Sequence, residues 1–84
     1  MNRSEIFAEV QRRIAEMFEM DPAKIREESL LREDLDLDSI DAIDLAVKIQ
    51  EMTGKRVEES ALRSIRTVGD VVDVIARLLA SQAG

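Results

Sequence analysis

The sequence of 84 residues contains no cysteine and no histidine. Without cysteine, neither a disulfide framework nor a thiolate metal site can form, and without histidine the commonest general base and metal ligand is missing. One proline and three glycines are too few turn residues for a many-stranded fold. No apolar run approaches the roughly 20 residues that a membrane helix needs, which predicts no membrane insertion and a cytoplasmic location.

The residues that are present are mainly aliphatic and acidic. A hydrophobic fraction of 45% and a charged fraction of 36% are typical of a globular chain, and the length predicts a single domain, residues 1–84. Eighteen acidic against 12 basic residues give a formal net charge of −6. This balance argues against nucleic-acid binding and favours partner proteins with basic surfaces. We expect a monomer.

Hydrophobic periodicity predicts an all-α fold, a four-helix bundle with a short third helix and a long loop between the first and second helices. The expected helices are residues 3–20, 39–53, 58–64 and 68–80. A connection as long as the first loop is usually functional in so small a domain.

Local signals mark several helix ends. Asn2 with Glu5, and Thr67 with Asp70, each have the spacing of a capping box. Gly54 is placed to end the second helix as a C-terminal cap.

The second predicted helix is apolar over most of its circumference, which indicates a central helix that exposes one charged sector. That sector contains Asp41, Asp44, Lys48 and Glu51. Ile43 is expected in the core, so that Ile43→Asp would place a charge among apolar side chains and unfold the domain.

Residues 34–45 read DLDLDSIDAIDL, with one serine among five aspartates. The opening D-x-D-x-D resembles a calcium-binding EF-hand loop, but the sixth position needs glycine and holds Ser39, and the twelfth needs glutamate and holds Leu45. A specific calcium site is therefore disfavoured. An ordinary helix cap at Asp38 or Ser39 explains the D-S pair but not the other acids.

The serine of this stretch raises the question of chemistry. A catalytic Ser39 needs a base, and the nearest lysine, Lys48, is nine residues further on, so catalysis by this chain alone is disfavoured. A serine at an exposed helix start is instead accessible to a modifying enzyme, and a phosphate attached there would meet free backbone N–H groups.

With this motif the sequence resembles the acyl carrier protein family, in which the serine of D-S-L or D-S-I receives 4'-phosphopantetheine from coenzyme A. The resemblance extends over almost the whole chain, through the length, the acidity, the helix order and the segment IRTVGDVVDVI. It implies a non-catalytic carrier that is modified by a phosphopantetheinyl transferase. Its further partners would be ketosynthase, acyltransferase, reductase or dehydratase enzymes of fatty-acid or polyketide-type synthesis with basic docking patches.

The resemblance assigns roles to individual positions. Ser39 would carry the arm, and Asp38 is the acid that precedes it. The acidic docking residues would be Asp36, Asp41, Asp44 and Glu51. The positions that line the family's acyl-holding interior correspond to Leu35, Ile40, Ile43, Val47, Ile65 and Val68, for which plain core packing is the alternative.

Some residues depart from the family pattern. Asp36 stands where the family commonly has glycine, which leaves the loop geometry open. Lys48 lies in the charged sector, where carriers of fatty-acid synthesis usually have a small or apolar residue, and Arg63 and Arg66 add positive charge in and after the third helix. These differences bear on the choice of partners, and the pattern is closer to stand-alone carriers of specialised bacterial clusters, such as aryl-polyene pathways. The alternatives are an unmodified acidic interaction module and a peptidyl carrier.

Overall fold

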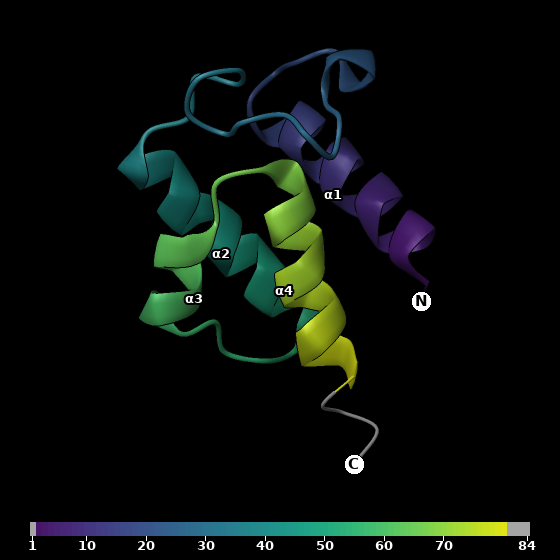
Figure 1. The fold of residues 1–84 in the computed structure, drawn as a ribbon, viewed down its shortest axis with the longest axis vertical. Helices are drawn as coiled ribbons and strands as arrows, with labels where there is room; N and C mark the ends of the chain where they lie inside the picture. Colours follow the sequence, from purple (N-terminus) through teal and green to yellow (C-terminus); the bar gives the residue numbers. More distant parts are fainter. Residues whose placement is uncertain (1, 81–84) are drawn as a thin grey trace.

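A computed structural model describes residues 2–80 of the chain. Four α-helices and one short 3-10 turn make up its regular structure, and the all-α prediction with a short third helix and a long first loop is confirmed (Figure 1). The elements are α1 (Arg3–Met17), η1 (Pro22–Lys24), α2 (Ser39–Thr53), α3 (Glu59–Ser64) and α4 (Val68–Ala80). None of the described helices is long and apolar enough to cross a membrane.

The capping signals of the sequence are present as hydrogen bonds. The Asn2 side chain accepts from the Glu5 backbone N–H at 2.9 Å, and the Glu5 carboxylate accepts from the Asn2 backbone N–H at 3.0 Å. At the other end of the chain Thr67 and Asp70 form the second such pair. Gly54 ends α2 with a φ of 67°, a left-handed conformation that glycine adopts without steric cost.

The first helix is shorter than the sequence predicts. It ends at Met17 rather than near Met20, because the backbone leaves the helical conformation at Phe18 and turns left-handed at Glu19, with a φ of 53°. The apolar period continues through Phe18 and Met20, which are partly buried. The pattern alone therefore overestimated the length of the helix. The periodicity of apolar residues indicates which side chains are buried. It does not detect a change of backbone conformation that leaves the same side chains buried.

The long loop between α1 and α2 is attached to the rest of the bundle by backbone hydrogen bonds. Leu31 N–H donates to the carbonyl of Arg66 at 2.9 Å, and Val68 N–H donates to the carbonyl of Ser29 at 3.0 Å. These two bonds join the loop to the start of α4. The loop is therefore an ordered part of the fold, and it delivers the chain to the start of α2 along a fixed path.

A close approach between α4 and the loop depends on Gly69. Its N–H donates to the carbonyl of Glu27 at 2.8 Å, and a Cβ at this position would lie 3.2 Å from that oxygen. Arg3 bridges the same region by pairing with the carboxylates of Glu27 and Asp73. These contacts join α1, the loop and α4 at one end of the bundle.

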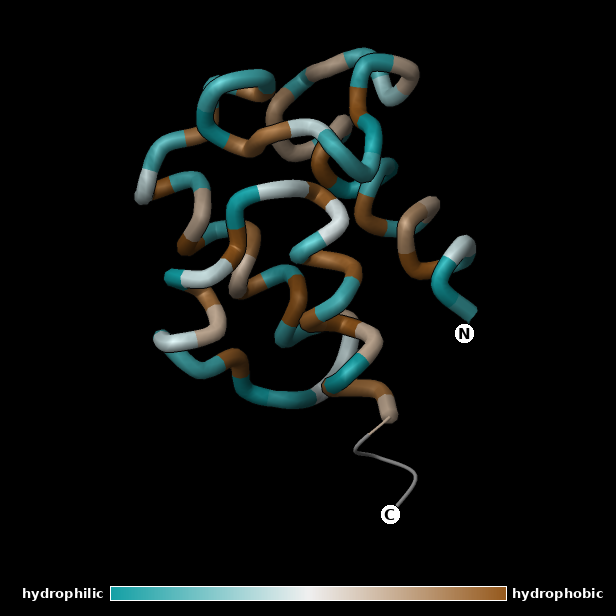
Figure 2. The backbone as a smooth tube through the Cα atoms, in the orientation of Figure 1, coloured by the Kyte–Doolittle hydropathy of each residue, from teal (hydrophilic) through white to brown (hydrophobic). Residues whose placement is uncertain are grey.

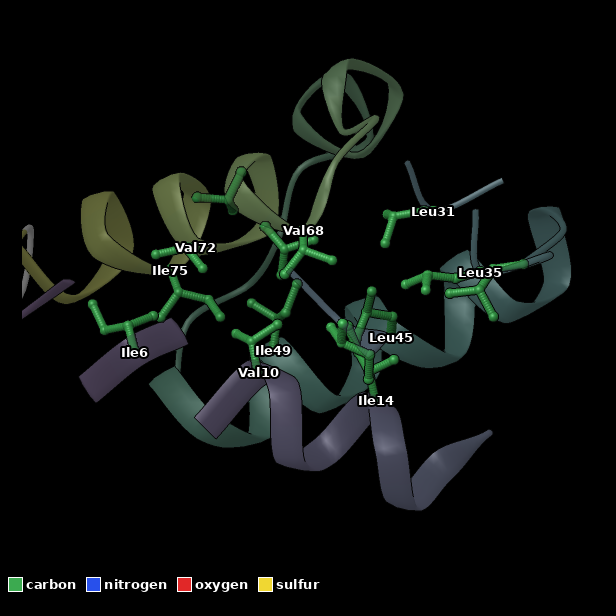
Figure 3. Close-up of a cluster of buried hydrophobic side chains, with 14 of the residues drawn as sticks. Ile6, Val10, Ile14, Leu31, Leu35, Leu45, Ile49, Val68, Val72 and Ile75 are labelled. Atoms are coloured by element: carbon green, nitrogen blue, oxygen red, sulfur yellow. The ribbon is translucent and has the colours of Figure 1, made fainter. Parts of the chain in front are cut away.

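The core lies between α1, α2 and α4, whose apolar side chains point toward one another (Figure 3). The largest side chains that are fully buried are Ile6, Val10, Ile14, Ile25, Ile49, Val68, Val71, Val72 and Ile75. The hydropathy of the chain follows this arrangement, with apolar segments recurring along α1 and α4 (Figure 2). The short α3 contributes partly buried residues and no fully buried one.

The carboxylate of Asp70 is held at the start of α4. It accepts from the backbone N–H of Arg66 at 2.9 Å and from that of Thr67 at 3.0 Å. These hydrogen bonds favour the ionised form and lower the pKa of Asp70.

We expect Asp70→Asn to make the domain less sensitive to acid. Because the folded-state pKa is lowered, the contribution of Asp70 to stability is fully present above its unfolded pKa of about 4 and is lost as the pH falls through the lower folded pKa. The variant should have a lower free energy of unfolding at neutral pH and a shallower decline below about pH 4. Urea denaturation over a pH series measures both quantities. Asp44→Asn is the control, and an acid decline as steep in Asp70→Asn as in the wild type would contradict the assignment.

Candidate functional site

Ser39 is the first residue of α2, and its side chain is exposed. The residue that caps the helix is Asp38, whose Oδ1 accepts from the backbone N–H groups of Ile40 and Asp41, both at 3.0 Å. In return the Asp41 carboxylate accepts from the Asp38 N–H at 3.1 Å. Among the described residues the Ser39 hydroxyl makes no hydrogen bond, so this hydroxyl is free for a reaction partner.

The backbone just before the D-S-I motif is held in an uncommon conformation. Asp36 has a φ of 56°, in the left-handed region that glycine adopts without strain. The sequence left the loop geometry at position 36 open, because the family commonly has glycine there. In the structure, Asp36 adopts a backbone conformation of the kind that glycine permits. Aspartate tolerates this region better than most residues. The turn at Asp36 leads directly into Leu37, which is buried, and Asp38.

We expect the stability of the domain to depend on which side chain occupies position 36. Asp36→Gly should keep the free energy of unfolding within about 1 kcal/mol of the wild type, whereas Asp36→Val should lose about 1–2 kcal/mol, because the two methyl groups on its branched Cβ crowd the backbone at a positive φ. Urea denaturation measures the difference. Glu33→Val, in the same exposed loop but without a positive φ, is the matched control. Equal stability of the two valine variants would mean that the left-handed backbone imposes no cost.

The four predicted docking acids differ in the hydrogen bonds and ion pairs of their carboxylates. Asp36 and Asp44 are exposed, and neither carboxylate has a hydrogen bond or an ion pair within the described residues. Asp41 is engaged in the cap of α2, and the Glu51 carboxylate lies 3.3 Å from the Nζ of Lys48. In the described part of the chain, Asp36 and Asp44 are therefore the two docking acids that present unpaired carboxylates near Ser39.

The six residues predicted to line an interior fall into two groups. Leu35 and Val68 are buried, with exposed fractions of 7% and 0%, and Ile65 is partly buried against the core. The remaining three are on the surface, with exposed fractions of 68% for Ile40, 60% for Ile43 and 44% for Val47. The expected core position of Ile43 was therefore wrong, while the acyl-lining role of the six residues stays a prediction.

The physical reason is which side of α2 packs against the core. Its buried residues are Leu45, Ala46, Ile49 and Thr53. Ile43 precedes Leu45 by two positions, about 200° around the helix, so the two side chains point to opposite sides. Ile40, Ile43 and Val47 follow one another at helical spacing and form a continuous apolar stripe beside Ser39. The sequence did not reveal this stripe, because a helix that is apolar on nearly all sides gives no sign of which side is covered.

Comparison with known proteins identifies this arrangement. Residues 8–75 match the family model described as "Phosphopantetheine attachment site". The chain is also 48% identical to "Acyl carrier protein 2" of Ralstonia nicotianae over 96% of its own length and 100% of that relative. The chain belongs to the acyl carrier protein family.

Other acyl carrier proteins agree in sequence and in structure. The acyl carrier protein of Saccharopolyspora erythraea is 40% identical, over 99% of this chain and 92% of that protein. The crystal structure of the acyl carrier protein from Thermotoga maritima superposes with a TM-score of 0.84 at 29% identity, covering 98% of this chain and 95% of the other. The acyl carrier protein from Enterococcus faecalis has a TM-score of 0.75 at 25% identity, with 92% and 98% covered. The predicted family, fold and phosphopantetheine cofactor are thus confirmed.

The residues at the start of α2 fit a covalently attached phosphopantetheine. The Ser39 hydroxyl is exposed and has no hydrogen bond among the described residues, while its neighbour Asp38 accepts from the backbone N–H groups of Ile40 and Asp41. The helix start adds the positive end of the helix dipole, which stabilises a phosphodiester charge. An attached group would therefore extend into solvent without displacing a capping bond.

Proposed function

We propose that Ser39 is the residue to which a phosphopantetheinyl transferase attaches 4'-phosphopantetheine from coenzyme A, and that this chain carries acyl groups without catalysing a reaction itself. The observation that supports this most strongly is that the cap at the start of α2 does not use the Ser39 side chain. Asp38 and Asp41 cap the helix reciprocally, and Ser39 between them is left exposed. A serine needed for the cap would have its oxygen on a backbone N–H group.

The chain's proposed part in the modification is to position the Ser39 hydroxyl. Within the described residues, no base is hydrogen-bonded to Ser39, so removal of its proton depends on the transferase. The Asp36 turn and the Asp38–Asp41 cap fix where Ser39 Oγ is presented. Once attached, the cofactor supplies a terminal thiol that forms thioesters with acyl groups.

Partner enzymes would be recognised by the surface around Ser39. The unpaired carboxylates of Asp36 and Asp44 attract a basic rim around a partner's active-site entrance. The apolar stripe lies next to these acids, and its residues Ile40, Ile43 and Val47 are more exposed than a core role would allow. Three large apolar side chains in a row mark a surface that a partner covers. We propose ketosynthase, acyltransferase, reductase and dehydratase enzymes of fatty-acid or polyketide-type synthesis as such partners.

The interior side of the fold is proposed to shelter the acyl chain. Leu35, in the loop before α2, and Val68, at the start of α4, are both buried, and Ile65 follows the end of α3. Because α3 has no fully buried residue and no side-chain cap, its displacement would disturb the core little. An acyl chain would enter beside these three residues. The cytoplasmic location and the monomeric state remain predictions from the composition.

The proposed function is tested by modification of the purified chain. Incubation with coenzyme A and a broad-specificity phosphopantetheinyl transferase should add one phosphopantetheinyl unit, measured by intact mass, and peptide mapping should locate it on Ser39. Reactions without coenzyme A are the control. A chain that remains unmodified with several such transferases would favour the unmodified interaction module.

A further inference from the structure

Lys48 is the cation on the exposed side of α2, nine residues after Ser39. Two acids on the same helix are within reach of its side chain, Asp44 one turn before it and Glu51 one turn after it. The structure pairs it with Glu51, at 3.3 Å between Lys48 Nζ and Glu51 Oε2. No ion pair joins Lys48 to Asp44 in the described part of the chain.

This pairing divides the charged face of α2 into two parts. Near Ser39, the carboxylates of Asp36 and Asp44 have no partner within residues 2–80, and the local charge is negative. One turn further, the charges of Lys48 and Glu51 cancel. The Lys48 side chain is 39% exposed and that of Glu51 57%, so both groups would meet a protein that docks on this face.

We propose that Lys48 determines which partners the carrier accepts, by neutralising Glu51 and confining the acidic docking surface to the Ser39 end of α2. The inference rests on the proposed function. It specifies the partner by its chemistry, as an enzyme whose cations lie close to its active-site entrance and which has no cation opposite residues 48–51. A partner cation there would face the Lys48 ammonium and would have to displace an existing ion pair to reach Glu51. Such like-charge juxtaposition is a recognised source of discrimination between partners.

The pair can be removed without loss of the fold. Exposed ion pairs between residues three positions apart contribute little to stability, and neither Lys48 nor Glu51 belongs to the core. Substitutions at these two positions therefore report on docking.

The inference is tested with the phosphopantetheinylated protein and a ketosynthase that elongates acyl chains on acidic bacterial carrier proteins. The variants are Lys48→Ala, Glu51→Ala and the combination, with Asp44→Ala for comparison. Lys24→Ala removes a positive charge from the distant η1 turn and is the matched control. At low salt, Lys48→Ala should raise kcat/KM about three- to tenfold through the association rate, and the gain should vanish at high salt. Glu51→Ala should lower kcat/KM at low salt, because it leaves the Lys48 ammonium unpaired, and the combined variant should return to about the wild-type value, because these two positions then again carry no net charge.

Each result is decisive. A combined variant that reacts as fast as Lys48→Ala would show that the freed Glu51 carboxylate attracts no partner, and would overturn the inference. So would an unchanged rate in Lys48→Ala, or an equal gain in Lys24→Ala. A failure of the proposed function is recognised separately, because Ser39 would then accept no arm before any ketosynthase is added.

Discussion

Ser39→Ala is expected to accept no phosphopantetheine and to unfold at the same urea concentration as the wild type. The substitution removes the only atom proposed to form the phosphodiester. It removes no cap, because the Asp38 carboxylate, and not the Ser39 hydroxyl, accepts from the N–H groups of Ile40 and Asp41. Loss of the modification should therefore be complete while the free energy of unfolding changes by less than about 0.5 kcal/mol.

Two further variants separate the hydroxyl from the cap. Ser60→Ala replaces an exposed serine on α3 and should be modified at the wild-type rate. Asp38→Ala should lose about 0.5–2 kcal/mol of stability, because the first backbone N–H groups of α2 lose their acceptor. Intact mass and urea denaturation measure both properties. A Ser39→Ala protein that unfolds early, or that still gains the arm, would contradict the assignment of Ser39.

Ile49→Asp is expected to unfold the domain, and Ile43→Asp, on the same helix, is expected to leave it folded. Ile49 is 1% exposed and lies in the core, whereas Ile43 is 60% exposed in the apolar stripe. A carboxylate at position 49 would be buried without a partner, at a cost of several kcal/mol. Small domains have only about 5–15 kcal/mol of total stability, so this cost is a large part of it. At position 43 the carboxylate stays in water.

Far-ultraviolet circular dichroism and urea denaturation distinguish the two variants. Ile43→Asp should keep the wild-type spectrum and yet react more slowly with partner enzymes, because it places a charge within the proposed contact surface. This reverses the expectation from the sequence, which placed Ile43 in the core. Unfolding of Ile43→Asp together with Ile49→Asp would mean that the stripe is covered by the protein itself.

The local features of this chain could be predicted because their signals act over three or four residues. The reciprocal bonds of Asn2 with Glu5 and of Thr67 with Asp70 need only the right side chains at the right spacing. The same holds for Gly54, whose left-handed conformation ends α2 where the sequence places the end. The D-S-I motif likewise placed the candidate Ser39 at a helix start.

Tertiary structure decided which faces and which partners these elements have. The sequence could not tell that Ile43 faces solvent, because that depends on where α1 and α4 lie and a helix that is apolar all round offers several faces to bury. It could not choose between Asp44 and Glu51 as the partner of Lys48, since both are at favourable helical spacing. The left-handed turns at Glu19 and Asp36 have no local signal of the kind that glycine gives, so the sequence alone did not indicate them. Side chains three or four positions apart determine caps and helices, whereas burial and docking surfaces depend on contacts between segments distant in sequence.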